Sequence, residues 1–127
     1  MIDRRIPLSD VQKDTFRTLS ERRGDSIVVH LKGNADIDAQ EHLKKFLDEL
    51  HQQAMQLGIR TAVFELEELY FMNSSCLSLL LRHVNAVMAT PSSKAYRLVF
   101  RPNGNLRWQK RSLQALGSYA PDIVSVE

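Results

Sequence analysis

The sequence predicts an α/β domain with a mixed, mostly parallel sheet of about five strands and helices packed against it. Apolar strands and amphipathic helices follow one another in the order ββαβαβαβ. Because a crossover helix joins parallel neighbours in a sheet, this order predicts that most strands run parallel. The chain has 127 residues, of which 43% are hydrophobic, and it contains no repeat or long linker. That is enough apolar material for one core, so we expect a single domain.

The chain opens with residues 1–12, which we assign to an N-terminal arm because they show no clear periodicity and include a proline. Residues 13–127 are assigned to the domain. Residues 16–21 are the first predicted strand and residues 26–32 are the second. The Gly24–Asp25 pair between these extended runs favours a hairpin.

The clearest predicted helix lies between Asp36 and Gly58. Asp36 or Asp38 is expected to cap its start, because a carboxylate accepts hydrogen bonds from the first free amides of a helix. Gly58 is expected to end it. Apolar residues recur at spacings of three and four, which places them on one helical face. They are Leu43, Leu47, Leu50, Ala54 and Leu57.

A near-continuous apolar run, residues 59–66, follows as a strand that we expect to be covered on both faces. The next helix begins at Ser74, and Pro91 with its polar neighbours breaks it. Apolar residues at helical spacing predict its inward stripe. These are Leu77, Leu80, Leu81, Val84 and Met88.

The last part of the chain contains two further strands, residues 96–100 and residues 122–126. Residues 102–104 are predicted to form a turn. Asn105 is the expected cap of a third helix, which Gly117 is expected to close. The apolar side of this helix carries Leu106, Leu113 and Leu116.

Charge is distributed unevenly along the chain, although the net charge is only +2 at pH 7. Residues 69–121 include seven basic residues and no acidic residue, whereas all fifteen acidic residues lie elsewhere. This separation suits docking to an acidic surface. A solvated basic face explains it equally well at the level of sequence.

Several function classes find no support in the sequence. The single cysteine leaves no intrachain disulfide and no cysteine-based zinc cluster, and the four histidines lack the spacing of metal ligands. Phosphate-binding loops, dinucleotide fingerprints and nucleophile elbows are absent from the sequence, so we expect no cofactor, no metal and no catalysis. Apolar runs stay far below the roughly 20 residues of a membrane span, and nothing resembles a signal peptide. We therefore expect a cytoplasmic protein.

The candidate functional residues lie where the 59–66 strand leads through a loop into the Ser74 helix. Amides at a helix start have no partner within the helix and attract anions. A hydroxyl of Ser74 or Ser75 can therefore serve as a simple cap or as a site of modification.

One aromatic residue lies among basic residues near the third helix. Trp108 is flanked by Arg107, Lys110 and Arg111, a combination that can stack on bases and contact phosphates. A single aromatic is a thin platform, so nucleic-acid binding is the weaker interpretation. A tryptophan ring covering the core is the more common arrangement.

The segment Phe71-Met72-Asn73-Ser74-Ser75-Cys76-Leu77, with its preceding strand and following leucine-rich helix, resembles the signature of the STAS domain. That family includes the bacterial anti-sigma-factor antagonists. Its usual pattern is an apolar strand followed by Asp-Ser-Ser/Thr-Gly-Leu at the opening of a helix. Gly33-Asn34-Ala35-Asp36 is similar to the family's Gly-x-apolar-Asp corner, and the order of elements fits over residues 16–126.

The resemblance implies a binding module rather than an enzyme. Many such antagonists sequester a serine kinase-type anti-sigma factor, are released by phosphorylation of the first serine of the motif, and are restored by a metal-dependent phosphatase. Carried over by position, Ser74 is the phosphoacceptor, and any nucleotide belongs to the partner. The implied interface consists of Asp36, Asn73, Ser74, Ser75, Cys76, Ser78 and Arg82.

Two positions depart from the family pattern. Asn73 stands where the family usually has Asp; it still caps a helix but lacks a carboxylate. Cys76 stands where the family usually has Gly and adds a side chain where a partner approaches. A thiol in the first helical turn can have a lowered pKa, yet without a second cysteine Cys76 is interpreted as a small packed residue. His83, further along this helix, is expected at the surface.

Two other functions are compatible with these residues. STAS-like chains also serve as scaffold subunits of stress-sensing complexes and of lipid-transport assemblies. Alternatively, the start of the Ser74 helix binds an anion or a nucleotide. A monomer and a homodimer are both compatible with the sequence.

Overall fold

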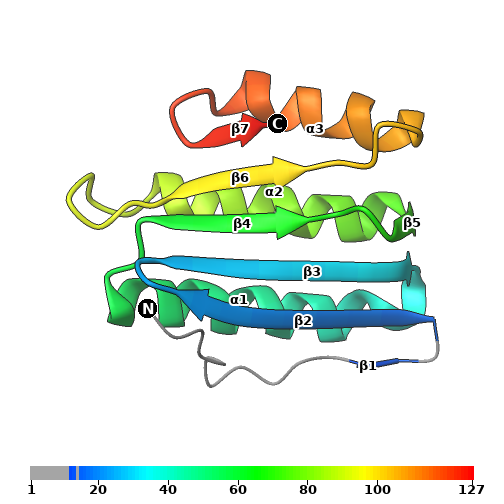
Figure 1. Cartoon of the computed structure of the whole chain (residues 1–127), viewed down its shortest axis with the longest axis horizontal. Helices are drawn as coiled ribbons and strands as arrows, with labels where there is room; N and C mark the ends of the chain where they lie inside the picture. Colours follow the sequence, from blue (N-terminus) through cyan, green and yellow to red (C-terminus); the bar gives the residue numbers. More distant parts are fainter. Residues whose placement is uncertain (1–11, 14) are drawn as a thin grey trace.

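The computed structural model describes residues 12–13 and 15–127, which form one sheet with helices against it (Figure 1). The five predicted strands are present, and two short ones, β1 and β5, join them. Within the described residues the sheet has seven strands in the order β1-β2-β3-β4-β6-β7, with β5 paired to β3. The strands are β1 Gln12–Lys13, β2 Phe16–Arg23, β3 Ser26–Ala35, β4 Thr61–Glu65, β5 Leu69–Met72, β6 Arg97–Arg101 and β7 Val124–Val126. The predicted α/β class is confirmed.

The helices are α1 Gln40–Leu57, α2 Ser74–Met88 and α3 Arg107–Tyr119, with a short 3-10 turn, η1 Ile37–Ala39, before α1. α1 and α2 lie side by side behind the sheet in Figure 1, and α3 lies along β7. None of the helices in the described part of the chain has the length and apolar content that a membrane crossing needs.

Strand directions follow the prediction of a mixed sheet. β2 and β3 form the expected antiparallel hairpin, whose turn contains Gly24 at φ 63°. A positive φ of this kind is favourable for glycine because glycine has no Cβ. β3, β4, β6 and β7 are parallel to one another. Gly58 ends α1 at φ 63°, as expected.

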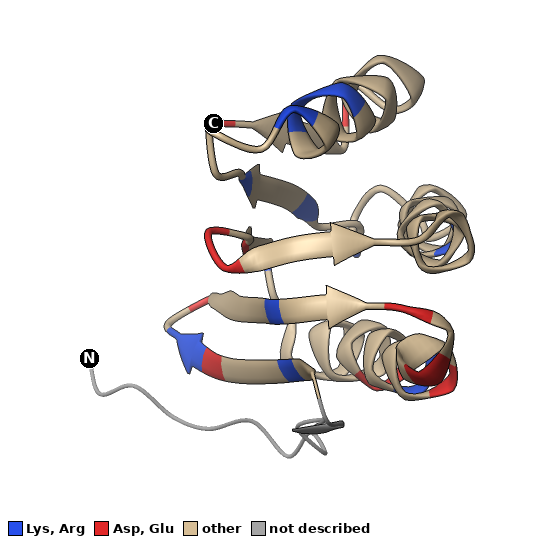
Figure 2. Cartoon of the chain, turned by 90° about the vertical axis from the view of Figure 1, so that its right-hand side faces the viewer, with Lys and Arg blue, Asp and Glu red and all other residues tan. Residues whose placement is uncertain are grey.

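Residues on both faces of β4 are buried, as predicted, although α1 and α2 both pack on the same face of the sheet (Figure 2). The main core, between the sheet and the helices, contains Ala62 and Phe64 of β4. On the other face, Val28, Val63 and Val99 form a small separate apolar cluster across three adjacent strands. Ion pairs flank this stripe, including Arg101 Nη1 with Glu65 Oε2 at 2.9 Å. Long charged side chains can shield neighbouring apolar surface. A strand can therefore have an almost continuous apolar sequence without a second layer of helices.

α2 is rotated relative to the predicted stripe. Leu81 and Met88, expected inside, are 36% and 47% exposed. His83, expected at the surface, is 5% exposed, and its Nε2 lies 3.3 Å from the Tyr96 hydroxyl. A buried histidine with a hydrogen-bond partner is tolerated in a core, and hydropathy alone does not reveal it. The buried residues of α2 are Cys76, Leu80, His83, Val84 and Val87.

α3 begins and ends differently from the prediction. Its N-cap is Leu106, which makes no side-chain cap bond, so Asn105 does not cap it. The buried Gln109 organises this region instead: its Oε1 accepts from the Asn103 amide, and its Nε2 donates to the carbonyls of Leu66 and Leu69. Gly117 lies inside the helix rather than at its end.

The proposed N-terminal arm lies almost entirely outside the described residues, which exclude 1–11 and 14. Gln12, its last residue, belongs to β1 and pairs with Arg17 of β2. The boundary between residues 12 and 13 therefore falls within a strand.

Candidate functional site

The candidate site lies where β3 and β5 end next to the start of α2. β3 pairs with β4 along its first half and with β5 along its last residues, and the register shifts between Gly33 and Asn34. Gly33 has φ 92°, and a Cβ there would collide with the carbonyl of Thr15. Glycine is therefore required at this bulge.

The parallel pairing of β3 and β5 brings the Asp36 corner next to the Ser74 motif. Ala35 pairs with Met72, and the Asn73 amide donates to the Ala35 carbonyl at 2.9 Å. The carboxyl ends of parallel strands lie at one edge of a sheet, which is the usual location of binding sites in α/β folds. The structure thus places together the two segments that carry the resemblance.

Asn73 is the N-cap of α2. Its Oδ1 accepts a hydrogen bond from the Cys76 amide at 2.8 Å, and its carbonyl accepts from the Leu77 amide. This bond satisfies one of the amides that a helix start leaves without an intrahelical partner. The capping function therefore belongs to Asn73 and not to the two serines.

Ser74 is the first residue of α2 and is exposed, as are Ser75 and Ser78. Ser78 Oγ donates to the Ser74 carbonyl at 3.0 Å, one turn further along the helix. The Ser74 hydroxyl thus lies at the positive end of the α2 dipole with access to solvent, where an added anion is electrostatically tolerated.

Cys76 faces inward, as expected for a small packed residue, and therefore does not occupy space open to a partner. Its side chain is completely buried, and its Sγ donates to the Asp36 carbonyl at 3.5 Å. Burial, together with the nearby Asp36 carboxylate, raises the pKa of the Cys76 thiol. The expectation that a helix start could lower the pKa of this thiol is therefore wrong. The residue joins the Asp36 corner to α2.

Asp36 is partly exposed and caps η1, since its Oδ1 accepts from the Asp38 amide at 3.0 Å. Neither aspartate caps α1 itself, whose N-cap is Ala39 without a side-chain bond; Asp36 caps the short turn that precedes it. Arg82, two turns beyond Ser74, pairs with Asp48 of α1 at 3.0 Å. Both side chains are about half exposed, so this surface pair adds little stability and remains accessible.

Three large exposed side chains that the sequence alone did not single out belong to the segments that carry the Asp36 corner and the Ser74 motif. Ile37, directly after Asp36, is 76% exposed, and Tyr70 and Phe71 of β5 are 56% and 48% exposed. Exposed apolar residues grouped at one edge mark interaction surfaces more often than isolated ones do. Their position in the sequence could have indicated them. Ile37 directly follows Asp36, and Tyr70 and Phe71 lie within four residues of Ser74.

A groove of about 550 Å³ extends from Ser74 between α2 and α3. Figure 2 views the molecule from this side and shows the basic positions of α3 in blue. The groove is lined by Ser74, Leu77, Ser78, Leu81, Arg111, Ser112, Ala115, Leu116 and Tyr119.

The arrangement of elements is similar to that of solved structures. One is an anti-sigma factor antagonist from Mycobacterium paratuberculosis, which is 18% identical, with 85% of each chain covered and a TM-score of 0.59. The chain has the fold of an anti-sigma factor antagonist. A second structure with this fold, the anti-sigma factor antagonist SpoIIAA in its unphosphorylated form, is 22% identical, with 87% of each chain covered and a TM-score of 0.54. No protein-family model and no curated protein matches the chain.

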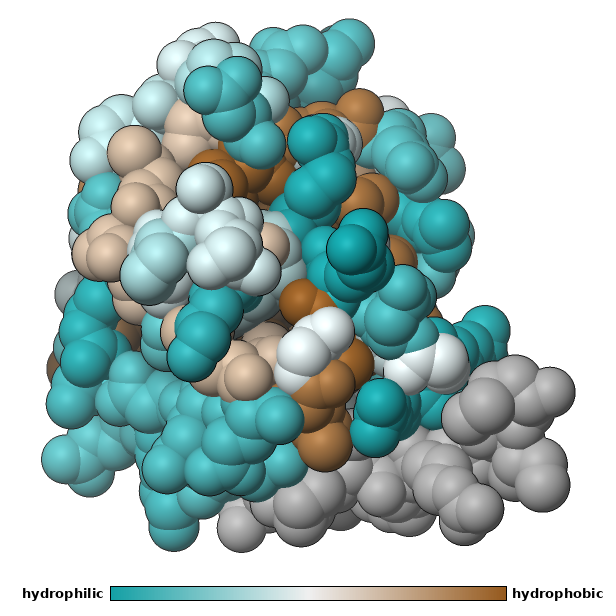
Figure 3. Space-filling model, turned by 90° about the vertical axis from the view of Figure 1, so that its left-hand side faces the viewer, coloured by the Kyte–Doolittle hydropathy of each residue, from teal (hydrophilic) through white to brown (hydrophobic). Residues whose placement is uncertain are grey.

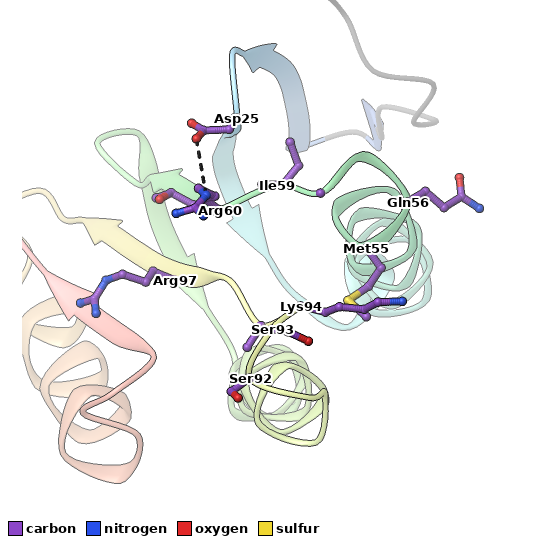
Figure 4. A pocket seen from close by; sticks show the side chains of 12 residues that line it. Asp25, Met55, Gln56, Ile59, Arg60, Ser92, Ser93, Lys94 and Arg97 are labelled. Atoms are coloured by element: carbon purple, nitrogen blue, oxygen red, sulfur yellow. Dashed lines mark ion pairs between the residues drawn. The ribbon is translucent and has the colours of Figure 1, made fainter.

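A larger cavity of this STAS-like fold, about 690 Å³, lies at the opposite end of the strands. Figure 3 shows that side, where hydrophilic residues dominate the surface around small apolar areas. Three basic side chains line the cavity, but Figure 4 shows Arg97 pointing away from it, and Arg60 is paired with Asp25 at 4.0 Å. The cations do not converge on one point, so we do not assign a binding role to this cavity.

The Trp108 ring covers part of the core, which is the more common arrangement for a tryptophan. Its ring packs against the main core, and its Nε1 donates to the Tyr70 carbonyl at 2.9 Å. The ring is therefore engaged within the domain. Within the described residues there is also no group of three side chains suited to holding a metal ion.

Proposed function

We propose that this protein is a non-enzymatic regulator that binds a serine kinase-type anti-sigma factor through the edge of the sheet at Ser74. The observation that carries this proposal is the exposed Ser74 hydroxyl at the first residue of α2, on a fold shared with two anti-sigma factor antagonists. The interface consists of the Asp36 corner, the loop from Asn73 to Ser75, and Ser78 and Arg82 on α2.

Phosphorylation of Ser74 switches the complex off in this proposal. A phosphate adds about −1.5 to −2 charges. The amide-rich start of α2 tolerates that charge, because the helix dipole is positive there. A partner surface shaped around a neutral hydroxyl would instead meet an uncompensated charge, which weakens binding steeply. A metal-dependent phosphatase restores the active form.

The exposed apolar residues support a protein as the partner. Ile37 follows the Asp36 corner, Phe71 precedes the Ser74 motif, and both are exposed; burying such side chains contributes most of the free energy of association at protein interfaces. The same residues would serve a permanent scaffold contact, so the response to phosphorylation is what separates a switch from a scaffold.

The test uses the serine kinase-type regulators encoded in the same genome, each incubated with the purified protein and Mg-ATP. We expect one phosphate, mapped to Ser74 by mass spectrometry, and a fall in affinity of at least about tenfold by calorimetry. Ser74→Ala should accept no phosphate, whereas the matched control Ser75→Ala, also exposed, should be labelled as the wild type is.

Labelling that persists in Ser74→Ala would reject the switch. Tight binding of a regulator that neither phosphorylates the protein nor responds to Ser74→Glu would favour the scaffold function. Stabilisation by nucleotide alone, measured as a shift in melting temperature, would favour the nucleotide-binding alternative.

A further inference from the structure

The groove between α2 and α3 has an apolar floor with exposed apolar walls. Leu77 and Leu116 pack at its base, and Leu81 and Tyr119 are 36% and 52% exposed at its sides. The Tyr119 hydroxyl donates to Asn85 Oδ1 at 2.7 Å, which ties the end of α3 to α2. The groove is therefore an apolar surface between two helices that this hydrogen bond links near their C-terminal ends.

The charge around the groove has one sign. Arg111 is the single ionic side chain among its lining residues, and Arg107 and Lys110 are exposed on the same end of α3. α2 and α3 contain no acidic residue. No ion pair of Arg111 occurs among the described residues, so its guanidinium is available to a carboxylate from another molecule.

We propose that this groove binds an acidic amphipathic helix of a protein partner, an inference that rests on the proposed function as a regulator-binding module. Leucine-type side chains at positions i, i+4 and i+7 of that helix fill the space between Leu77, Leu81 and Tyr119. Carboxylates on its flank face Arg111. An extended segment fits less well, because the two helices that form the groove offer no free strand edge for backbone pairing.

Ser74 and Arg111 both line this groove, so phosphorylation of Ser74 can act directly on a helix bound there. A phosphate on Ser74 adds negative charge to the same space that the acidic helix occupies. Like charges brought together at an interface oppose binding. Phosphorylation therefore weakens the docked helix directly, without a change of fold.

The probe is a synthetic helical peptide of about 15 residues, long enough to form a helix, with leucines at the stated spacing and glutamates on its flanks. A matched peptide carries lysine in place of glutamate. Titration into isotopically labelled protein, followed by amide chemical shifts, should show the acidic peptide perturbing α2 and α3. The lysine peptide should bind at least about tenfold more weakly.

Variants test the location of the site. Arg111→Glu should weaken the acidic peptide by about tenfold or more, while Arg107→Glu, the same charge change on the same helix but outside the groove lining, should change it by less than about threefold. Ala115→Arg, an exposed position in the groove, should block binding.

The outcomes separate this inference from the proposed function. Peptide binding that is lost in Arg111→Glu but unaffected by Ser74→Glu supports the groove and rejects the switch. A kinase-type regulator that binds while the acidic peptide does not, equal losses in both arginine variants, or shifts confined to Ile37 and Phe71 overturn the groove proposal. Binding to anionic phospholipid vesicles without any response to the peptide overturns it as well.

Discussion

Asn73 caps α2, and Ser74 presents an exposed hydroxyl. The sequence alone left open which of the two residues is the cap. The Asn73 side chain accepts from the Cys76 amide at 2.8 Å, so the start of α2 is capped without help from a serine. The Ser74 hydroxyl makes no hydrogen bond within the described residues and is exposed. A serine that the fold does not need as a cap is free to serve as a site of modification.

Replacing Asn73 tests this division. Asn73→Ala should lower the free energy of unfolding by about 1 kcal/mol, because the Cys76 amide loses its partner. Asn73→Asp keeps an acceptor oxygen and adds negative charge at a helix start, so it should equal the wild type or exceed it by about 0.3–1 kcal/mol. Urea denaturation measures both changes.

Ser74→Ala is the matched control, and it should change the free energy of unfolding by less than about 0.5 kcal/mol. If Ser74→Ala were as destabilising as Asn73→Ala, the serine would share the capping function. The Ser74 hydroxyl would then not be reserved for regulation.

At the scale of elements, the bulge in β3 decides where the site forms. Gly33 lets β3 leave β4 and pair with β5, which carries Asp36 to the side of Asn73. The sequence predicted β3 and the Asp36 corner, because Gly33 and Asp36 follow the end of an apolar run. It did not predict β5, because four residues with two consecutive exposed aromatics show no alternation.

Gly33→Ala should be far more destabilising than Gly24→Ala. Both glycines have positive φ, but a Cβ at Gly24 meets nothing, whereas a Cβ at Gly33 meets backbone atoms of Thr15. We expect losses of about 1 kcal/mol at Gly24 and about 3 kcal/mol or more at Gly33, measured by urea denaturation. Equal losses would mean that the bulge relaxes and is not fixed by the close approach.

Other elements show why helix faces were harder to predict than helices. α2 was predicted at the right place, and Leu80 and Val84 are buried as predicted, but the inward stripe also includes the polar His83 and excludes Leu81. The start of α3 was missed for a similar reason: no side chain caps this helix, and the buried Gln109 instead bonds the Asn103 amide and the Leu66 carbonyl. Both cases depend on hydrogen bonds between segments far apart in the chain, which periodicity does not encode.

At the scale of the whole molecule, a buried polar cluster joins α1 and α2 to the sheet. His51 Nδ1 of α1 lies 2.7 Å from the Tyr96 hydroxyl, which lies 3.3 Å from His83 Nε2 of α2. The pKa of His83 is lowered to about 3, mainly by burial and in addition by the nearby His51 and Arg82, while a hydrogen bond with the Leu47 backbone opposes the shift. Burial also lowers the pKa of His51 and raises that of Tyr96.

These shifts predict that acid destabilises the fold. Because the pKa of His83 is lower in the folded chain than its ordinary value of 6.5, the unfolded chain binds the proton first as the pH falls. The free energy of unfolding should therefore be fully present above pH 6.5 and fall by up to about 1.4 kcal/mol per pH unit below it, from this histidine alone. Urea denaturation between about pH 8 and pH 5, above the range where most carboxylates titrate, measures the slope.

His83→Gln removes one titrating group and should reduce this slope to the contribution of His51, whose pKa burial also lowers, even if the variant is less stable at every pH. The matched control is His42→Gln, an exposed histidine on α1, which should keep the wild-type slope. Comparing slopes rather than absolute stabilities separates proton linkage from lost packing, because a cavity or a missing hydrogen bond costs the same amount at each pH. A slope unchanged in His83→Gln would mean that the cluster opens to solvent or that other groups dominate acid unfolding, and the two helices would then not be held to the sheet by a neutral histidine.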